Sequence, residues 1–328
     1  MNLVITLDAG TTNSRAVLWR GDKVLNEVRT SVGVRDTAMS GSNDALARGV
    51  TGCMVGVCLK AGIAPEAVDL VVASGMITSS LGLKEVPHLV APVGLDDLAA
   101  GMVSESFPGV WHKPVWFVPG VKNKAGMVSG DELPLMDMMR GEEVETIALQ
   151  QRLGTHGACW FILPGSHTKF VRLSKNGRIM QIVSTLAGEM MDALSHNTIL
   201  AASVEPGSGM NPKWLLKGYR VSVEQGLSRA AYCVRLAQLW SESSKADRTS
   251  YLLGVLLGSD IIALKACGAA KDTIYVAGRE ELREAFVTLL NADGGFRDVH
   301  PIDPALLKDL AGWGALLAAR RRGLASGE

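Results

Sequence analysis

Residues with the chemistry to hold the phosphates of a nucleotide lie close to the start of the chain. Asp8 ends an apolar segment, the turn Gly10–Asn13 follows, and a second apolar segment runs to Trp19. Gly10 lets the backbone approach a ligand closely, hydroxyls and turn N–H groups can donate to phosphoryl oxygens, and a carboxylate such as Asp8 can hold a hydrated Mg²⁺. An ordinary hairpin with a polar turn has the same pattern, so this segment alone does not decide between the two interpretations.

A second segment of the same design occurs halfway along the chain. The apolar run Gly157–Leu163, a glycine- and hydroxyl-rich turn and a run ending at Leu173 repeat the first pattern. In both copies a further turn and a third strand follow, Lys23–Thr30 in the first and Arg178–Ser184 in the second. Short repeats indicate a solenoid, whereas a repeat of domain size indicates two similar lobes that face each other across a cleft.

The composition is that of a globular protein without a strong global charge. The 328 residues favour two domains, and 33 basic side chains balance 33 acidic ones, so neither nucleic acid nor a membrane surface is expected as a partner. Five scattered cysteines are expected to be reduced. Residues 1–20 lack the features of a signal peptide. The most apolar window, Tyr251–Ala270, contains Asp260 and Lys265, which favours a buried helix and a cytoplasmic protein.

The elements expected around these turns alternate between strands and helices. Short strands that end at glycine or small residues are expected at Val68–Met76, Val115–Gly120 and Thr273–Gly278, where each delivers a loop to the edge of a cleft. A last strand is expected at Arg297–Ile302. Periodicity and capping residues predict helices at Asn43–Ala61, Gly141–Leu153, Gly188–Leu200, Val223–Ser241, Ser250–Ala266, Arg279–Leu290 and Pro304–Arg321.

These features resemble the superfamily of actin, sugar kinases and heat-shock ATPases. In that superfamily two duplicated lobes each carry a hairpin that cradles the phosphates of ATP, and a glycine-bearing loop near the C-terminus contacts adenosine. The resemblance implies an α/β fold with two duplicated ribonuclease-H-like lobes and an interlobe cleft. The N-terminal lobe would span residues 1–155 and the C-terminal lobe residues 156–328, with the last helix able to pack back on the first lobe.

Within the superfamily, several stretches are similar to the 2-dehydro-3-deoxygalactonokinase family of bacterial sugar-acid kinases. The most specific are Arg140–Glu143 and Pro164–Lys169, and the resemblance covers most of the chain. Other matching stretches are Gly10–Ala16, Ala73–Met76, Ala187–Glu189 and Ser195–Leu200. The chain departs from the family at Ala9, Phe170 and Glu145, where we expect an aromatic residue, Trp and Gln.

The family resemblance implies a reaction and its cofactors. A kinase of this family uses ATP and Mg²⁺ to phosphorylate the C6 hydroxyl of 2-dehydro-3-deoxy-D-galactonate, giving 2-dehydro-3-deoxy-6-phosphogalactonate in galactonate catabolism. Phosphoryl transfer needs charge neutralisation and positioning more than covalent help, so Asp8 is expected to organise the metal unless it only caps its turn. Lys169 is expected either to neutralise phosphate charge or to be a solvated strand residue. The residues expected to contact ATP are Gly10, Thr11, Thr12, Asn13, Gly165, Ser166, His167, Thr168, Lys169 and Gly278.

The acceptor hydroxyl must lose its proton as it attacks, and a carboxylate can accept that proton. We expect Glu142, at the start of a helix, to be this base, with Asp137 as the second choice. Glu142 and Glu143 would otherwise only complement the helix dipole. The carboxylate of a sugar acid needs cationic or N–H-rich partners, unless the arginines there pair with acidic neighbours. The candidates for this contact are Arg15, Ser74, Gly75, Met76 and Arg140.

Other kinds of site are less well supported by the sequence. His156, His167 and His196 are irregularly spaced and lack paired cysteines, so we do not expect them to form a metal site. The chain has no P-loop motif, and Pro206–Gly209 lacks the third glycine of a dinucleotide fingerprint. A kinase of another sugar acid or of a hexose stays open, as do a non-catalytic ATP-binding switch protein and a homodimer.

Overall fold

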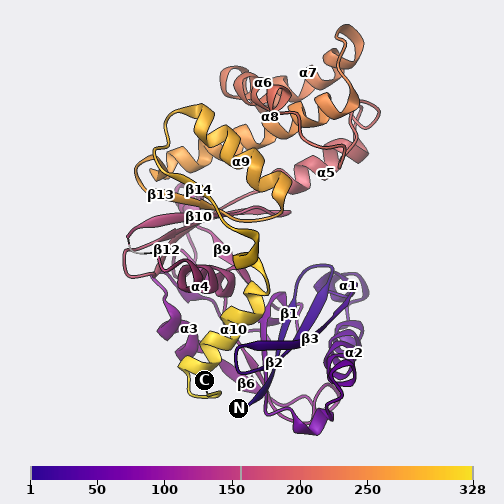
Figure 1. Cartoon of the computed structure of the whole chain (residues 1–328), viewed down its shortest axis with the longest axis vertical. Helices are drawn as coiled ribbons and strands as arrows, with labels where there is room; N and C mark the ends of the chain where they lie inside the picture. Colours follow the sequence, from indigo (N-terminus) through magenta and orange to yellow (C-terminus); the bar gives the residue numbers. More distant parts are fainter. Residues whose placement is uncertain (1, 156, 327–328) are drawn as a thin grey trace. The chain divides into compact units, whose positions relative to one another are not determined.

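The computed structural model describes residues 2–155 and 157–326, and Figure 1 shows their helices and strands. The chain divides into two compact units. Unit 1 consists of Met1–His156, Asn176–Ile182 and Lys308–Glu328, and unit 2 consists of Gly157–Lys175 and Val183–Leu307. The predicted lobes are contiguous ranges, whereas these units are not, because the end of the chain groups with its beginning. His156, which the sequence analysis considered as a metal ligand, lies outside the described residues.

A six-stranded sheet forms the centre of unit 1. Its strands, in spatial order, are β3 (Lys23–Thr30), β2 (Ser14–Arg20), β1 (Leu3–Ala9), β4 (Leu70–Gly75), β7 (Val115–Phe117) and β6 (Val103–Glu105). β1, β2 and β3 form an antiparallel meander, β4 is parallel to β1, and β7 is parallel to β4. β6 closes the sheet as an antiparallel edge strand. The parallel pairing of β1 and β4 brings the carboxyl ends of both strands to one edge of the sheet.

The second sheet repeats this arrangement. Its strands, in spatial order, are β12 (Ile179–Thr185), β11 (Thr168–Leu173), β10 (Cys159–Leu163), β13 (Thr273–Val276) and β14 (Val299–Pro301). β10 and β11 are antiparallel, and β13 is parallel to both β10 and β14. The order of the first five strands of the first sheet is therefore reproduced. The predicted fold class, α/β with two similar ribonuclease-H-like sheets, is confirmed.

Helices cover both faces of the sheet in unit 1. They are α1 (Val34–Ser40), α2 (Asp44–Ala61), α3 (Leu95–Gly101), α4 (Glu142–Leu153) and α10 (Leu310–Arg321), with the 3-10 turns η1 (Pro65–Ala67), η2 (Met76–Thr78) and η3 (Gly130–Leu135). Ile5 and Leu18 belong to one buried cluster with Met54 of α2. Successive strand residues point to opposite faces, so Trp19 faces α10, where its ring lies 6.0 Å from that of Trp313. A small sheet of β5 (Leu89–Val90), β8 (Val121–Lys122) and β9 (Met138–Met139) completes the unit.

Unit 2 is built around one long buried helix. Its helices are α5 (Ala187–Asn197), α6 (Pro212–Gln225), α7 (Leu227–Trp240), α8 (Lys245–Ala266) and α9 (Glu280–Asp293), with the 3-10 turns η4 (Ala269–Lys271) and η5 (Pro304–Leu307). α8 contacts α5, α6, α7 and α9 (Figure 1). It is the one described helix long and apolar enough to cross a membrane, and 72% of its most apolar window is buried inside the protein. The sequence prediction of a buried core helix is confirmed.

Two of the expected helices are interrupted in the structure, and α8 begins at Lys245, before the expected start at Ser250. The expected helix Val223–Ser241 is divided at Gly226, whose φ of +82° ends α6 before α7 begins. α6 starts much earlier, at Pro212, where the side chain of Asn211 accepts a hydrogen bond from the Lys213 N–H. The expected helix Pro304–Arg321 is interrupted at Asp309, which has a left-handed backbone with φ +55°. α1, α3 and the small sheet were not predicted, because such short elements carry little periodicity.

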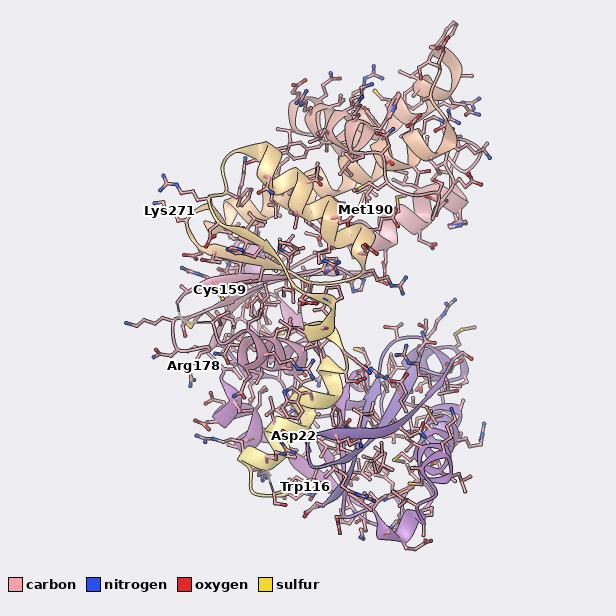
Figure 2. The ribbon with its side chains drawn as sticks, viewed as in Figure 1. Asp22, Trp116, Cys159, Arg178, Met190 and Lys271 are labelled. Carbon is pink, nitrogen blue, oxygen red and sulfur yellow. The ribbon has the colours of Figure 1, made fainter. Side chains whose placement is uncertain are left out.

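The five cysteines are all free, as expected for reduced core residues. Cys53, Cys58 and Cys159 are buried, and the other two are half-buried. Figure 2 shows Cys159 among the side chains around β10, whereas Lys271 extends outward from the ribbon. Burial raises the pKa of the Cys53 thiol, which keeps it protonated and unreactive at neutral pH.

Candidate active site

The first glycine-rich turn is held in place by the backbone on both sides. The Gly10 N–H donates to the Asn13 carbonyl (2.8 Å), which closes the turn between β1 and β2. The N–H groups of Val34 and Arg35, at the start of α1, donate to the carbonyls of Gly10 (3.2 Å) and Thr11 (2.9 Å). The backbone is therefore fixed, while the side chains at positions 11–13 are exposed and available to a ligand.

Asp8 lies directly behind this turn, at the carboxyl end of β1. A Cβ atom at Gly75 would lie 2.7 Å from Asp8 Oδ1, so the end of β4 touches the carboxylate. Arg15 is the cross-strand neighbour of Asp8 on β2. Burial raises the pKa of Asp8 to about 6, while Arg15 lowers it and the Glu142 charge raises it. The carboxylate is thus ionised at neutral pH and lies beside the predicted base.

The start of α4 approaches the same end of β4. A Cβ at Gly141, whose φ is +104°, would lie 3.3 Å from the Gly75 Cα. Glu143 is fully buried, and its Oε2 accepts a hydrogen bond from the Gly141 N–H (2.7 Å). Burial and the neighbouring Glu142 raise the pKa of Glu143 well above its usual range. The two adjacent glutamates therefore have different environments. Glu143 is buried and bonded to the backbone at the start of α4, whereas Glu142 is partly exposed.

A third carboxylate joins Asp8 and Glu142. Glu145 lies one helical turn after Glu142 on α4. Burial, followed by the charges of Asp8 and Glu142, raises the pKa of Glu145 to about 8. Asp137 lies elsewhere, in the loop before β9, where its Oδ1 accepts from the Met138 N–H (2.7 Å). Among the described residues, no group of three His, Cys, Asp or Glu side chains has the arrangement of a metal site.

The two candidate arginines have different environments. Arg15 forms ion pairs with both Glu27 and Asp309, so its guanidinium is already engaged by two carboxylates. The sequence left two roles open for Arg15, a contact with the substrate carboxylate or ion pairs with acidic neighbours. The structure contains the ion pairs. Arg140 has no such salt bridge in the described chain; its Nη1 donates to Thr78 Oγ1 (2.7 Å), and its Nη2 to the Val86 carbonyl (2.8 Å).

Nη2 of Arg140 also lies 3.3 Å from Nδ1 of His88. Burial and the positive charges of Arg140 and Lys122 lower the pKa of His88 to about 4, so this imidazole is neutral. Thr78 in turn donates to the Gly75 carbonyl (2.9 Å). This chain of contacts connects Arg140 to the turn Ser74–Met76 beside Asp8. The buried hydroxyl of Ser74 has no hydrogen-bond partner in the described chain.

The second glycine-rich turn, between β10 and β11, is supported from α5. Gly165, Ser166 and His167 are exposed. The Glu189 N–H donates to the Ser166 carbonyl (3.0 Å), and Glu189 Oε1 lies 2.8 Å from His167 Nε2. This support resembles that of the first turn, where the start of α1 holds the loop carbonyls.

The last two residues of this turn region, Thr168 and Lys169, are buried. Lys169 Nζ donates to Ser184 Oγ (2.6 Å). The alternative that Lys169 is a solvated strand residue is therefore wrong, because the residue is only 8% exposed.

Close approach of α5 to the second turn depends on Gly188. A Cβ there would lie 2.2 Å from the Gly165 carbonyl oxygen and 2.8 Å from the Ser166 Cα. Because both are backbone atoms, Gly188→Ala must displace the turn. We expect the KM for ATP to rise about tenfold, as measured by steady-state ADP release. Gly52→Ala on α2, where a Cβ meets nothing within 4 Å, is the matched control and should leave KM unchanged. An unchanged KM in Gly188→Ala would show that the turn does not bind the nucleotide.

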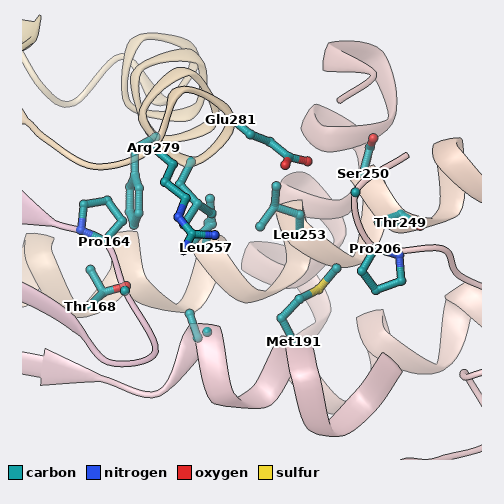
Figure 3. Close-up of a pocket in the computed structure, with 16 residues that line it drawn as sticks. Pro164, Thr168, Met191, Pro206, Thr249, Ser250, Leu253, Leu257, Arg279 and Glu281 are labelled. Atoms are coloured by element: carbon teal, nitrogen blue, oxygen red, sulfur yellow. The ribbon is translucent and has the colours of Figure 1, made fainter. Parts of the chain in front are cut away.

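A cavity of about 260 Å³ opens beside the second turn, within unit 2. α8 contributes Leu253 and Leu257, and Arg279 and Glu281 come from the start of α9. Figure 3 shows the Arg279 side chain directed into the cavity toward Leu257. The remaining lining residues are Pro164, Gly165, Thr168, Ala187, Gly188, Met191, Pro206, Gly207, Thr249, Ser250, Leu282 and Phe286. The walls are mostly apolar, with a few polar groups, as in pockets for flat organic ligands.

Gly278 immediately precedes Arg279, the N-cap residue of α9. Its φ of +92° belongs to the left-handed half of conformational space, which glycine adopts without strain. Arg283 is buried and donates from Nη1 to the Gly278 carbonyl (3.1 Å). The loop after β13 is therefore fixed next to the cavity. Gly278, Gly165 and Thr168, which the sequence analysis placed in two different nucleotide loops, lie in one region of unit 2.

A model of the 2-keto-3-deoxy-galactonokinase family matches residues 8–311 of the chain. The protein belongs to this family. Membership makes it a kinase, and it agrees with the family resemblance seen in the sequence. The matched range begins at Asp8 and includes both glycine-rich turns, the start of α4 and the loop at Gly278.

Individual relatives agree with the family assignment. The curated 2-dehydro-3-deoxygalactonokinase of Escherichia coli strain K12 is 23% identical over 297 residues, which cover 88% of this chain and 90% of the relative. A solved Sinorhizobium meliloti protein assigned as a 2-dehydro-3-deoxygalactonokinase has a TM-score of 0.77 at 23% identity, covering 97% of this chain and 98% of that one. The activator of 2-hydroxyisocaproyl-CoA dehydratase from Clostridium difficile, solved with bound ADPNP, has a TM-score of 0.52 at 14% identity, with 99% of both chains covered. The two solved structures share the fold of this chain.

Several residues near the sites of this kinase were not found from the sequence. Glu145 was noted only as a departure from the family, although its carboxyl lies near Asp8 and Glu142. His88 and Thr78 carry no local motif, and their contacts with Arg140 bridge 52 and 62 residues of sequence. Arg279 directly follows Gly278 of the predicted adenosine loop, so its position in the sequence could have indicated a residue of the same site.

Proposed function

We propose that this protein transfers the γ-phosphoryl group of ATP to the C6 hydroxyl of 2-dehydro-3-deoxy-D-galactonate, giving 2-dehydro-3-deoxy-6-phosphogalactonate. The observation that carries the proposal is the meeting of Asp8 and Glu142 behind a fixed phosphate turn, in a chain of this kinase family. The name of the Escherichia coli relative supports the identity of the acceptor. A role in galactonate catabolism in the cytoplasm follows from the same proposal.

Asp8 is the residue we assign to Mg²⁺. Mg²⁺ keeps several water ligands and commonly binds through one or two carboxylates together with substrate phosphates. One ionised carboxylate beside a glycine turn fits this requirement, although no group of three protein ligands is present among the described residues. Mg²⁺ held there would neutralise charge on the transferred phosphoryl group. The exposed side chains of Thr11, Thr12 and Asn13 would contact the outer phosphates.

Glu142 is the group we assign to the acceptor proton. It occupies the first position of α4, and its charge acts on Asp8, Glu143 and Glu145. A carboxylate in this position can accept a proton from a hydroxyl that attacks a phosphoryl group next to Asp8. Glu143 cannot replace it, because its carboxyl is buried and bonded to the Gly141 N–H.

We assign the carboxylate of the sugar acid to the neighbourhood of Arg140 and the turn Ser74–Met76. Arg140 is half-buried and its hydrogen bonds are to neutral groups, so its charge is available to an anion. Arg15 is held by Glu27 and Asp309 and is assigned the role of tuning Asp8. The neutral His88 keeps the guanidinium of Arg140 oriented.

The adenosine of ATP is assigned to the cavity of unit 2. Its apolar walls suit a purine, and the Arg279 side chain can lie against an aromatic face. Gly165, Ser166, His167 and Thr168 at one side would hold phosphates, and the buried Lys169 would offset their charge. The dehydratase activator from Clostridium difficile, which shares this fold, was solved with bound ADPNP. This supports a nucleotide site in the present chain.

Filling the cavity should weaken ATP binding selectively. Leu253→Trp adds a large side chain to a wall of the cavity, so we expect the KM for ATP to rise at least about tenfold while the KM for the sugar acid stays within about twofold. Ile262→Trp, at an exposed position on the same helix α8, is the control and should change neither value. Steady-state assays with each substrate varied separately give both constants. A Leu253→Trp variant with unchanged ATP KM would move the nucleotide away from this cavity.

The function itself is tested by ADP release with a panel of acceptors. Purified protein, ATP and Mg²⁺ are incubated with 2-dehydro-3-deoxy-D-galactonate, its gluconate epimer, other sugar acids and hexoses. We expect the galactonate derivative to give the largest kcat/KM, with phosphate on C6 shown by NMR. A larger value with another acid or a hexose would correct the acceptor. ATP turnover that no acceptor stimulates would refute the kinase proposal and favour a non-catalytic ATP-binding switch.

A further inference from the structure

An aspartate that the mechanism above does not use lies buried beneath the second glycine-rich turn. Asp260, on α8, is 2% exposed. It continues the face of α8 that lines the cavity, since Leu253, Leu257 and Asp260 recur at helical spacing. The hydroxyls of Thr168 and Thr185 lie beside its carboxyl and act on its pKa. Asp260 Oδ2 and Thr185 Oγ1 have no hydrogen-bond partner of normal geometry within the described chain.

The two threonines face α8 because of their positions on adjacent strands. Lys169 on β11 donates to Ser184 on β12, so these two residues share one face of the sheet. Successive side chains of a strand point to opposite faces, and Thr168 and Thr185 therefore share the other face, toward Asp260. Thr168 also lines the cavity and directly follows the exposed part of the turn. Thr168 therefore connects Asp260 with the assigned nucleotide site.

We propose that Asp260 is a positioning residue of the nucleotide site, which orients the hydroxyl of Thr168 toward the phosphates of ATP. The inference rests on the proposed function, because it takes the cavity and the second turn as the nucleotide site. Asp260 does not contact the nucleotide in this proposal. It acts through Thr168, and Thr185 occupies the second hydrogen-bonding position of the carboxyl.

The environment of Asp260 explains how it would orient a hydroxyl. Burial raises the pKa of Asp260 to about 7, opposed only by the two hydroxyls, and no charged side chain contributes. At pH 7 about half of a carboxyl with this pKa is the neutral acid, because burial without a cation disfavours the charged form. The neutral acid donates its proton in a hydrogen bond to a threonine oxygen. Thr168, once it accepts that bond, keeps its own single hydroxyl proton for a phosphoryl oxygen.

The neutral acid has a close mimic in asparagine. Asp260→Asn keeps the shape and supplies a permanent N–H donor to the threonine hydroxyls, whereas Asp260→Ala removes the partner altogether. We expect Asp260→Ala to raise the KM for ATP about tenfold, the effect of one hydrogen bond, and to leave the KM for the sugar acid within about twofold. Asp260→Asn should keep both constants within about twofold of wild type.

A double-mutant cycle tests whether Asp260 acts through Thr168. If it does, Asp260→Ala combined with Thr168→Val should be no worse for ATP than Thr168→Val alone. Ser222→Ala is the matched control. Ser222, on α6, has a buried hydroxyl that donates to the Val255 carbonyl of α8, the helix that carries Asp260 (2.9 Å). It should change neither KM. Thermal unfolding of each variant shows whether the folded population is comparable.

The outcomes separate this inference from the proposed function. An unchanged ATP KM in Asp260→Ala would overturn it, as would equal losses in Asp260→Asn and Asp260→Ala, or multiplicative effects in the double mutant. Calorimetric titration with ATP, without any acceptor, gives the same comparison as binding constants. Wild-type protein that binds ATP but phosphorylates no acceptor would refute the kinase proposal while the binding constants still test Asp260. Wild-type protein that does not bind ATP would overturn both.

Discussion

Asp8→Asn should reduce kcat by at least about a hundredfold at saturating ATP and sugar acid, because an amide does not hold a hydrated divalent cation as a carboxylate does. The substitution keeps the size of the side chain, which is needed where the end of β4 touches Asp8 Oδ1. Coupled measurement of ADP release gives kcat. A variant that retains wild-type turnover would remove Asp8 from any role in metal binding.

The fold of this variant should be at least as stable as that of the wild type. The pKa of Asp8 is raised in the folded protein, from 3.8 to about 6. The unfolded chain therefore releases the proton at lower pH, and the ionised Asp8 destabilises the fold as the pH rises through this interval. Asn has no such charge, so Tm at pH 7 should not fall. A lower Tm would mean that lost activity reflects unfolding, and Asp131→Asn, at an exposed position, is the control for a neutralised aspartate.

The same pKa predicts the acid limb of the activity. Only the ionised form of Asp8 binds a cation, so kcat/KM for ATP should be full well above pH 6 and fall as the pH drops through about 6. The residual activity of Asp8→Asn should lack this limb. A limb that persists in the variant would belong to another group.

The positions of most strands in both sheets could be predicted because their signals are local. Apolar runs broken by glycine turns define β1–β3 and β10–β12 within short stretches of sequence, and Gly75 and Gly278 mark the ends of parallel strands. The two glycine-rich turns follow from the same stretches. A duplicated pattern is also informative by itself, since an accidental hairpin would not recur with the same order of strands.

The parts that could not be predicted depend on contacts between distant residues. Arg15 was a candidate for the substrate carboxylate, but it pairs with Asp309, 294 residues away, and with Glu27 on β3. Nothing in the local sequence of Arg15 indicates that partner. Asp260 was read only as an interruption of an apolar helix, and its position beneath Thr168 results from the packing of α8 on the sheet. Burial and pKa depend on the tertiary structure, so the ion pairs of Arg15 and the raised pKa of Asp260 could not be predicted from the sequence.

Glu142→Gln should reduce kcat about a thousandfold and leave the KM of both substrates within about threefold. Glutamine has the shape of glutamate and preserves the start of α4, but it cannot accept the proton of the acceptor hydroxyl. Steady-state and single-turnover assays at saturating ATP separate this chemical step from product release. An effect on KM alone would assign Glu142 to binding and not to proton transfer.

Glu145→Gln is the matched control for this prediction. Glu145 lies one turn further along α4, and its pKa of about 8 keeps the carboxyl mostly protonated at pH 7. Glutamine resembles that neutral acid, so kcat should stay within about threefold of wild type. A loss as large as that of Glu142→Gln would mean that negative charge on Glu145 takes part in the reaction.

Asp137→Asn decides between the two predicted bases. Asp137 Oδ1 accepts from the Met138 N–H, and Asp137 is not among the charges that act on Asp8, so its substitution should leave kcat within about threefold. A large loss in Asp137→Asn with an active Glu142→Gln would make Asp137 the base. If both variants stay active, neither predicted base takes the proton, and Glu143 cannot replace them, since it is buried and its Oε2 is bonded to the Gly141 N–H. If Glu145→Gln is active as well, catalysis rests on positioning and charge neutralisation.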